Sequence, residues 1–271
     1  PESGEWMVKP LASAAGIGVR NFDEGIAEIG CEDHHFLQKR ATGRSISGLY
    51  LGSVKGVKLL GMCEQLCRGP AAGAGCYIYA GSVGPLSTDD IPQRAFHQAQ
   101  QIGSAISNWL AAEGTHFKGL FGIDFILDES SGDLWTLEVN PRYPASAELY
   151  ERGLGWPMIR WHVDVCRHSY LPTVKFMQQV SGGKNSRKQG KLIVYARKDF
   201  IAPDFIALTA PLTVLNDGNI SVADIPQTGT PIRKDEPVCT ILTAQENIAK
   251  CHETLTTASD ALLKLIDEIA E

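Results

Sequence analysis

The sequence lacks several features that would assign it at once to a class of protein. Its seven cysteines include no CxxC pair, so a zinc site is not expected. No apolar run reaches the 18 residues of a membrane span, and no signal peptide is visible. Acidic residues outnumber basic ones by 31 to 25, which argues against a general nucleic-acid binder. We therefore expect a cytoplasmic protein with reduced cysteines and no membrane or nucleic-acid partner.

The chain has 271 residues, of which 44% are hydrophobic, enough for one large domain or two smaller ones. It begins with Pro1 and enters a strand-like segment almost at once, so we expect further sequence upstream. The polar stretch SGGKNSRKQG, residues 181–190, predicts a boundary or mobile loop. This divides the chain into residues 1–180 and a strand-rich segment over 191–271 that ends in a helix.

Helical and strand periods are mixed along the chain, which predicts an α+β fold. Strands are expected over residues 5–10, 34–43, 119–127 and 134–140, and in a pair over 48–66 that turns at Lys55-Gly56. Residues 11–20 are expected to form a flexible loop. Helices are expected over residues 21–30, 92–114, 145–153, 157–171 and 246–270.

The strands at 119–127 and 134–140 read as a hairpin with the five-residue loop ESSGD between them. Centring that loop on Ser131 pairs residue 124 with 138, 126 with 136 and 127 with 135. Strand alternation then places three polar side chains on one face, with Thr136 and Ile126: Asp124, Glu138 and Asn140. The opposite face is apolar and reads as core: Ile123, Phe125, Leu127, Trp135, Leu137 and Val139.

Two carboxylates that face each other across a strand pair repel and destabilise the sheet. Open solvent, a nearby basic side chain or a divalent cation would offset this repulsion. Carboxylate and amide oxygens favour Mg²⁺ or Mn²⁺ over zinc, and Mg²⁺ completes its shell with water and substrate phosphates. The hairpin therefore suggests a metal–nucleotide site; the alternative interpretation is a solvated polar strand face.

Basic residues just after the hairpin and near the end of the first strand strengthen the first interpretation. Lys9 lies just before a loop of small residues, where backbone N–H groups can approach phosphate oxygens. The P-loop pattern GxxxxGK[ST] is absent. Arg142 follows the predicted carboxylates and could neutralise charge on a transferred phosphoryl group. An ion pair with Glu148 or Glu138 is the alternative for Arg142.

The order of these segments resembles the ATP-grasp superfamily over about residues 5–150. The segments are WMVKP, SAAGIG, FLQKRATG, GLFGIDFIL and LWTLEVNPR. The resemblance implies an ATP-grasp nucleotide-binding fold that holds ATP between two α+β lobes, here without the α/β domain that usually precedes it. The segment after residue 191 is similar to the C-terminal region of ATP-grasp carboxylases, although no lysine lies in a biotinylation context. The whole pattern also resembles ATP-grasp carboxylate–amine ligases, distantly the tyramine–glutamate ligases.

The resemblance implies a role for each matching residue. Nucleotide contacts are implied at Lys9, Ser13, Gly16, Gly18, Gln38, Lys39 and Arg40. Ligands of Mg²⁺ (or Mn²⁺) are implied at Asp124, Glu138 and Asn140. Catalytic roles at the phosphoryl group and the acceptor carboxylate are implied for Lys9 and Arg142. Gln38 replaces the glutamate that is common at the hinge, and Gly43-Arg44-Ser45 replaces a common G-x-E pattern.

The function implied is an ATP- and Mg²⁺-dependent ligase that forms a C–N bond. It would activate a small-molecule carboxylate as an acyl phosphate for attack by an amine. One alternative is a carboxylase that acts through carboxyphosphate. Another is a nucleotide-binding protein that has lost catalysis. A homodimer is a further expectation.

Overall fold

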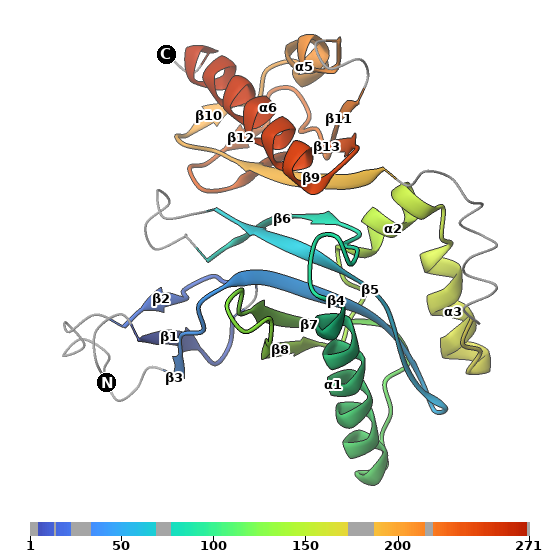
Figure 1. Ribbon diagram of the computed structural model, residues 1–271. Coiled ribbons are helices and arrows are strands. Elements are labelled where there is room, and N and C mark those ends of the chain that lie inside the picture. The colour runs from blue at the N-terminus through green and yellow to red at the C-terminus, as the bar shows by residue number, and fades with distance from the viewer. Residues whose placement is uncertain are drawn as a thin grey trace.

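The computed structural model describes residues 5–13, 15–22, 34–68, 77–172, 187–214 and 219–269. Its centre is an eight-stranded antiparallel sheet with the strand order β11-β13-β9-β6-β5-β4-β7-β8 (Figure 1). These strands are β4 Arg44–Ser53, β5 Gly56–Cys67, β6 Tyr79–Gly84, β7 Gly119–Leu127, β8 Leu134–Asn140, β9 Lys188–Tyr195, β11 Ile220–Ala223 and β13 Pro237–Gln245. The α+β class is confirmed, and so is the strand pair over 48–66. Its turn is Val54-Lys55, one residue before the predicted one, since Gly56 already pairs with Ser53.

The first strand of the C-terminal segment joins the same sheet as the strands before it. β9 pairs with β6 on one side and with β13 on the other, so one ladder runs across the predicted boundary at 181–190. The division into two units stays a prediction. Strand β6 was not expected from the sequence, because its Gly- and Ser-containing segment YAGSVG shows no clear alternation.

A separate three-stranded sheet lies beside the large one, on the left of Figure 1. It consists of β1 Trp6–Pro10, β2 Arg20–Asn21 and β3 His35–Lys39, with β1 in the middle. Val8 is its one fully buried side chain among the described strand residues. Most of the helix predicted over 21–30 falls outside the described residues. Two short strands, β10 Phe200–Ile201 and β12 Pro231–Ile232, pair near the C-terminal end.

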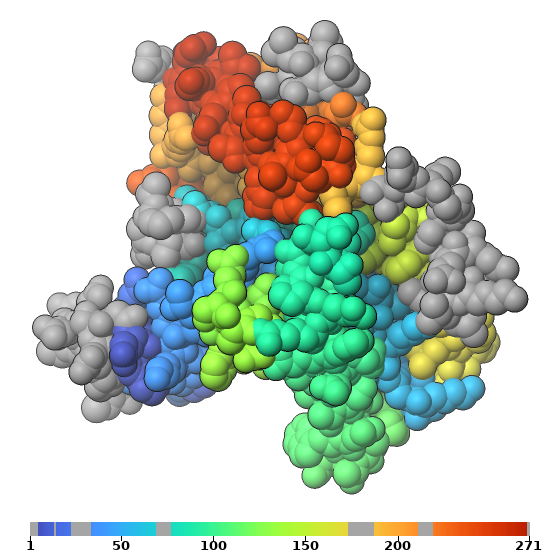
Figure 2. Space-filling model, viewed as in Figure 1, coloured from blue at the N-terminus to red at the C-terminus, as the bar shows by residue number. Residues whose placement is uncertain are grey.

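Helices cover both faces of the large sheet. The long helices α1 Gln93–Ala112 and α6 Ile248–Ile269 share one face, and Figure 2 shows them on the side turned to the viewer. The helices α2 Ala147–Leu154 and α3 Met158–His168 pack on the other face. Strand alternation explains this division, since Tyr50 points into the first layer while Leu49 and Leu51 point into the second. Among the helices that the structure describes, α5 Phe205–Val214 also contacts α6. No helix in the described part of the chain is long and apolar enough to cross a membrane.

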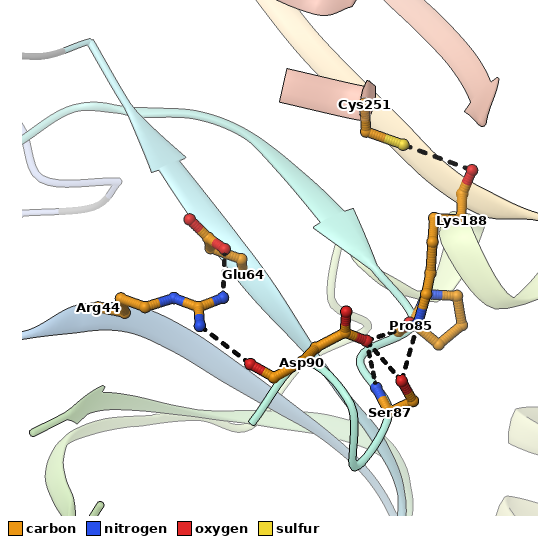
Figure 3. Close-up of polar contacts among 7 residues, drawn as sticks. All are labelled: Arg44, Glu64, Pro85, Ser87, Asp90, Lys188 and Cys251. Atoms are coloured by element: carbon orange, nitrogen blue, oxygen red, sulfur yellow. Dashed lines mark hydrogen bonds and ion pairs between the residues drawn. The ribbon is translucent and has the colours of Figure 1, made fainter. Parts of the chain in front are cut away.

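A network of charges joins the C-terminal segment to the rest of the sheet (Figure 3). Lys188 on β9 lies 2.6 Å from Asp90, whose backbone carbonyl accepts from Arg44 at 3.1 Å. Arg44 also pairs with Glu64 at 2.7 Å, and His252 on α6 lies 3.3 Å from the same carboxylate. Burial raises the pKa of Glu64, but hydrogen bonds from His252 and Arg44 outweigh it and leave that pKa lowered. The network therefore favours charged Glu64 and ties β4, β5, β9 and α6 together.

One glycine allows β6 and β9 to approach each other closely. Gly81 has φ +153°, and a Cβ there would lie 2.0 Å from the carbonyl oxygen of Lys191. We expect Gly81→Ala to lower the free energy of unfolding by about 2–3 kcal/mol, because the two strands must separate. Gly56→Ala is the matched control, since its φ is +120° but no atom lies within 4 Å. Urea denaturation should show that the control loses only about 1 kcal/mol of its free energy of unfolding. Equal losses in both variants would refute the steric argument.

Candidate active site

A cavity of about 110 Å³ lies over five neighbouring strands of the large sheet, β6, β5, β4, β7 and β8. It is lined by strand residues, by the segment that follows β8, and by one residue of the loop that follows β1. The lining residues are Ala15, Ser47, Gln65, Tyr79, Ser82, Gly122, Asp124, Glu138, Asn140, Arg142, Pro144, Ala145 and Ser146. Four of the eleven residues implicated from the sequence are therefore gathered in this cavity: Asp124, Glu138, Asn140 and Arg142.

The hairpin between β7 and β8 brings the acidic residues together. Asp124 pairs with Glu138 as predicted, and Gly122 pairs with Asn140. Nearer the turn the predicted register is wrong, because a bulge follows Asp124 and leaves Leu137 without a direct partner. Thr136 therefore pairs with Phe125 rather than with Ile126.

The bulge also changes the place of the tryptophan in this hairpin. Trp135 pairs with Ile126 and is 58% exposed, so its predicted place in the core is wrong. Leu134 is buried instead, opposite Leu127. The residues that carry polar oxygens are unaffected, since they lie beyond the bulge.

Asp124 accepts hydrogen bonds on both of its oxygens. Ser47 Oγ and Gln65 Nε2 donate to Oδ1 at 2.8 and 2.9 Å, and Asn140 Nδ2 donates to Oδ2 at 2.8 Å. Burial raises the pKa of Asp124 to about 6; the Ser47 hydrogen bond lowers that pKa, and the negative charge of Glu138 raises it. Burial and the charge of Glu138 thus disfavour the charged form of Asp124, and a bound cation would offset both effects.

The raised pKa of Asp124 gives stability a specific dependence on pH. The folded state keeps a proton that the unfolded chain releases near its ordinary value of 3.8, so the free energy of unfolding falls as pH rises from about 4 to about 6. We expect this contribution to be at most about 3 kcal/mol and to vanish in Asp124→Asn. Urea denaturation with EDTA between pH 4 and 7 measures it. An identical pH dependence in the wild type and the variant would contradict it.

The donor set fits a hard divalent cation. Asp124 Oδ2 and Glu138 Oε1 both contact the same atom, Asn140 Nδ2, at 2.8 and 3.4 Å, so the two carboxylates converge on one point. The two carboxylates supply oxygen ligands of the kind that Mg²⁺ and Mn²⁺ accept. Asn140 turns its NH₂ group to them here, so its amide oxygen joins the set only when that side chain turns over. The described residues contain no group of three or more His, Cys, Asp and Glu side chains that could hold a metal, as a zinc site would need.

Arg142 brings a positive charge to the cavity wall. Its backbone N–H donates to the carbonyl of Asn140 at 2.8 Å, which turns the chain sharply after β8. Among the described residues no ion pair with Arg142 is formed, and Glu148 pairs with Lys191 at 3.0 Å instead. The ion pair with Glu148 or Glu138 that was the alternative for Arg142 is therefore not seen, and the guanidinium is exposed.

The loop after β1 reaches the cavity from the small sheet. The carbonyl of Ala15 accepts from Tyr79 N at 3.0 Å, and Ser13 Oγ donates to the carbonyl of Ile17. Gly16 has φ +81°, and a Cβ there would lie 2.0 Å from the carbonyl oxygen of Tyr77. Only glycine permits this approach of two backbones.

The other residues implicated in nucleotide binding lie outside the cavity lining. Lys9 is half-buried on β1 opposite Phe36. Gln38 and Lys39 lie on β3 opposite Met7 and Trp6, and the N–H of Arg40 donates to the carbonyl of Glu5 at 2.7 Å. Gly18, with φ +75°, ends the loop after β1. Their nucleotide contacts stay predictions.

Sequence reasoning missed five polar residues of the cavity: Ser47, Gln65, Tyr79, Ser82 and Ser146. The alternation of Ser45 and Ser47 with Ile46 was a usable signal, since it marks a strand with one polar face. Nothing local relates Gln65 or Tyr79 to Asp124. They line the same cavity only because β6, β5, β4 and β7 lie side by side in the sheet.

The sheets and the cavity define a class of α+β proteins in which a small sheet and its glycine loop face an acidic hairpin on a large antiparallel sheet. A family model described as an ATP-grasp domain matches residues 1–146, just over half of the chain. The chain belongs to the ATP-grasp family. A search of curated proteins finds no match.

Solved structures share the fold at low sequence identity. Carboxyaminoimidazole ribonucleotide synthase from Aspergillus clavatus, complexed with ATP, has a TM-score of 0.69 and 14% identity over 97% of this chain and 63% of its own. L-Amino acid ligase from Bacillus licheniformis has a TM-score of 0.67 and 14% identity, and the match covers 96% of this chain and 63% of the ligase. Biotin carboxylase from Campylobacter jejuni has a TM-score of 0.62 and 14% identity, and the match covers 97% of this chain and 61% of the carboxylase. The chain thus spans less than two thirds of the length of these proteins.

Proposed function

We propose that this chain is the nucleotide-binding part of an ATP- and Mg²⁺- (or Mn²⁺-) dependent ligase that joins a carboxylate to an amine. The observation that carries the proposal is the convergence of Asp124, Glu138 and Asn140 beside Arg142, which forms no ion pair with any residue that the structure describes. The glycine loop reaches the same cavity. The family match supports it, as do neighbours whose names include ligases and complexes with ATP or ADP.

The proposed reaction has two steps. An oxygen of the substrate carboxylate attacks the γ-phosphorus of ATP, the bond to the bridging oxygen breaks, and ADP leaves. The amine then attacks the acyl carbon, phosphate leaves, and the nitrogen loses a proton. Asp124, Glu138 and Asn140 would hold the cation, which supplies charge neutralisation at the phosphates.

The protein's own part in this reaction is positioning and charge stabilisation. Arg142 would bind the carboxylate and the acyl phosphate formed from it, since a guanidinium presents paired donors to such oxyanions. The loop over residues 13–18 would cover the phosphates and exclude water, which protects the acyl phosphate from hydrolysis. Lys9, at the end of β1 just before this loop, would add positive charge from the small sheet.

A carboxylase is the second candidate. Its specific support is that two of the neighbours reported above are named carboxyaminoimidazole ribonucleotide synthase and biotin carboxylase. In that reaction bicarbonate takes the place of the organic carboxylate, and the intermediate is carboxyphosphate. The first step and the roles of Asp124 and Glu138 would be the same.

Phosphate release separates the candidates. The chain is incubated with Mg-ATP and a panel of carboxylates, each with and without amines, and phosphate and ADP are measured. Release that requires both a carboxylate and an amine supports the ligase, whereas bicarbonate-dependent ADP formation supports the carboxylase. Nucleotide binding without turnover, in this chain and in one extended upstream, would indicate a nucleotide-binding protein without catalysis.

A further inference from the structure

The two oxygens of Asp124 have different surroundings, and this difference has consequences for the cation site. Oδ1 accepts two hydrogen bonds, from Ser47 Oγ at 2.8 Å and from Gln65 Nε2 at 2.9 Å. Oδ2 accepts from Asn140 Nδ2 at 2.8 Å, and that nitrogen also lies 3.4 Å from Glu138 Oε1. Oδ1 thus faces β4 and β5, while Oδ2 faces the side of β8 that carries Asn140 and Glu138.

The amide of Gln65 is itself oriented by a neighbour. Ser45 Oγ donates to Gln65 Oε1 at 2.9 Å, so the carbonyl side of the amide faces Ser45 and the NH₂ side faces Asp124. Strand geometry fixes this arrangement, because Ser47 pairs directly with Asp124 and Ser45 lies two residues away on the same face of β4. A chain of hydrogen bonds therefore runs from Ser45 through Gln65 to Asp124 Oδ1.

We propose that Gln65, oriented by Ser45, is a positioning residue that fixes the Asp124 carboxylate so that Oδ2 is the oxygen presented to the divalent cation. This inference rests on the proposed function. An sp² carboxylate oxygen that already accepts two hydrogen bonds has little capacity left for a cation. Oδ2 and Glu138 Oε1 then form the pair of anionic ligands.

Positioning matters because a freely rotating carboxylate must be ordered when the cation binds, and that ordering weakens affinity. Partners that orient a metal ligand typically contribute about 10- to 100-fold to metal affinity. When Asn140 turns its amide oxygen to the cation, its hydrogen bond to Oδ2 is lost. Ser47 alone would then hold Oδ1 by a single bond, about which the carboxylate can still turn. Gln65 supplies the second fixed point.

The test measures binding of Mn²⁺ alone by the full chain, from the electron paramagnetic resonance signal of the free ion. We expect Gln65→Leu, a substitution of similar size, to weaken binding by about 10- to 100-fold. Ser45→Ala should weaken it less, because the amide remains but is no longer oriented. Gln100→Leu is the matched control: Gln100 lies on α1, accepts from Leu59 N at 2.8 Å, and is not among the lining residues of the cavity.

The control separates positioning from general destabilisation, since Gln100→Leu should lower the melting temperature while leaving Mn²⁺ affinity within about twofold of the wild type. Wild-type chain that binds no Mn²⁺ would overturn the proposed cation site itself. Wild-type binding with unchanged affinity in Gln65→Leu would overturn only the positioning role. If Gln65→Leu does not fold, Ser45→Ala decides, and unchanged Mn²⁺ affinity there has the same meaning.

Discussion

Glu138→Gln is expected to reduce ATP-dependent phosphate release by at least about a thousandfold. The substitution keeps the shape of the side chain but removes one of the two negative charges that converge beside Asn140. Cation-mediated charge stabilisation is worth several kcal/mol in phosphoryl transfer, and each 1.4 kcal/mol is about tenfold in rate. Steady-state release of phosphate, in the reaction that the substrate panel identifies, measures the effect.

A second readout tests the same residue without turnover. Mg-ATP should raise the melting temperature of the wild type, because a ligand that binds only the folded state stabilises it, and this shift should be lost in Glu138→Gln. Glu113→Gln is the control, since Glu113 is an exposed residue at the end of α1 and is not among the residues that line the cavity. A full Mg-ATP shift in Glu138→Gln would rule out Glu138 as a ligand of the cation.

Arg142→Met is expected to lower kcat by about 10²- to 10³-fold, the usual effect of removing one group that stabilises charge in a transition state. Arg142 is suited to that role because it lies in the cavity wall, while the nearby carboxylate of Glu148 is paired with Lys191. Arg142→Lys should recover only part of the loss, since an ammonium cannot make two parallel hydrogen bonds to an oxyanion.

Kinetics with the carboxylate substrate check this prediction. Arg160→Met is the control, because Arg160 is exposed on α3 and pairs only with its helical neighbour Asp164 at 3.5 Å among the described residues. We expect the control to keep kcat within about twofold of the wild type. A rate for Arg142→Met that matches the control would show that Arg142 takes no part in the reaction.

The hairpin shows how far local reasoning extends. Alternation with a period of two, together with the centre of the turn, was enough to place Asp124 opposite Glu138. In a strand, every second side chain points to the same face, so the sequence of each strand shows which side chains share a face. The same reasoning failed for Trp135. A bulge adds one residue to one strand, so every pair between the bulge and the turn is displaced by one residue.

Local patterns in the sequence were enough to predict the candidate site residues and their order along the chain. The glycine loop, the acidic hairpin and the arginine after it are local patterns, and their succession was sufficient to indicate the ATP-grasp family, which the family match confirms. Local periodicity also predicted most of the helices and strands that carry them.

The neutral groups around Asp124 could not be predicted from local sequence, because they come from other strands. Ser47 and Gln65 lie 77 and 59 residues before Asp124, and they meet it because β4 pairs with β7 on one side and with β5 on the other. The tertiary structure likewise brings Lys191 of β9 to Glu148, which leaves Arg142 facing the cavity. The physical reason is that pairing between distant strands is selected by burial over the whole sheet, and no short stretch of sequence specifies it.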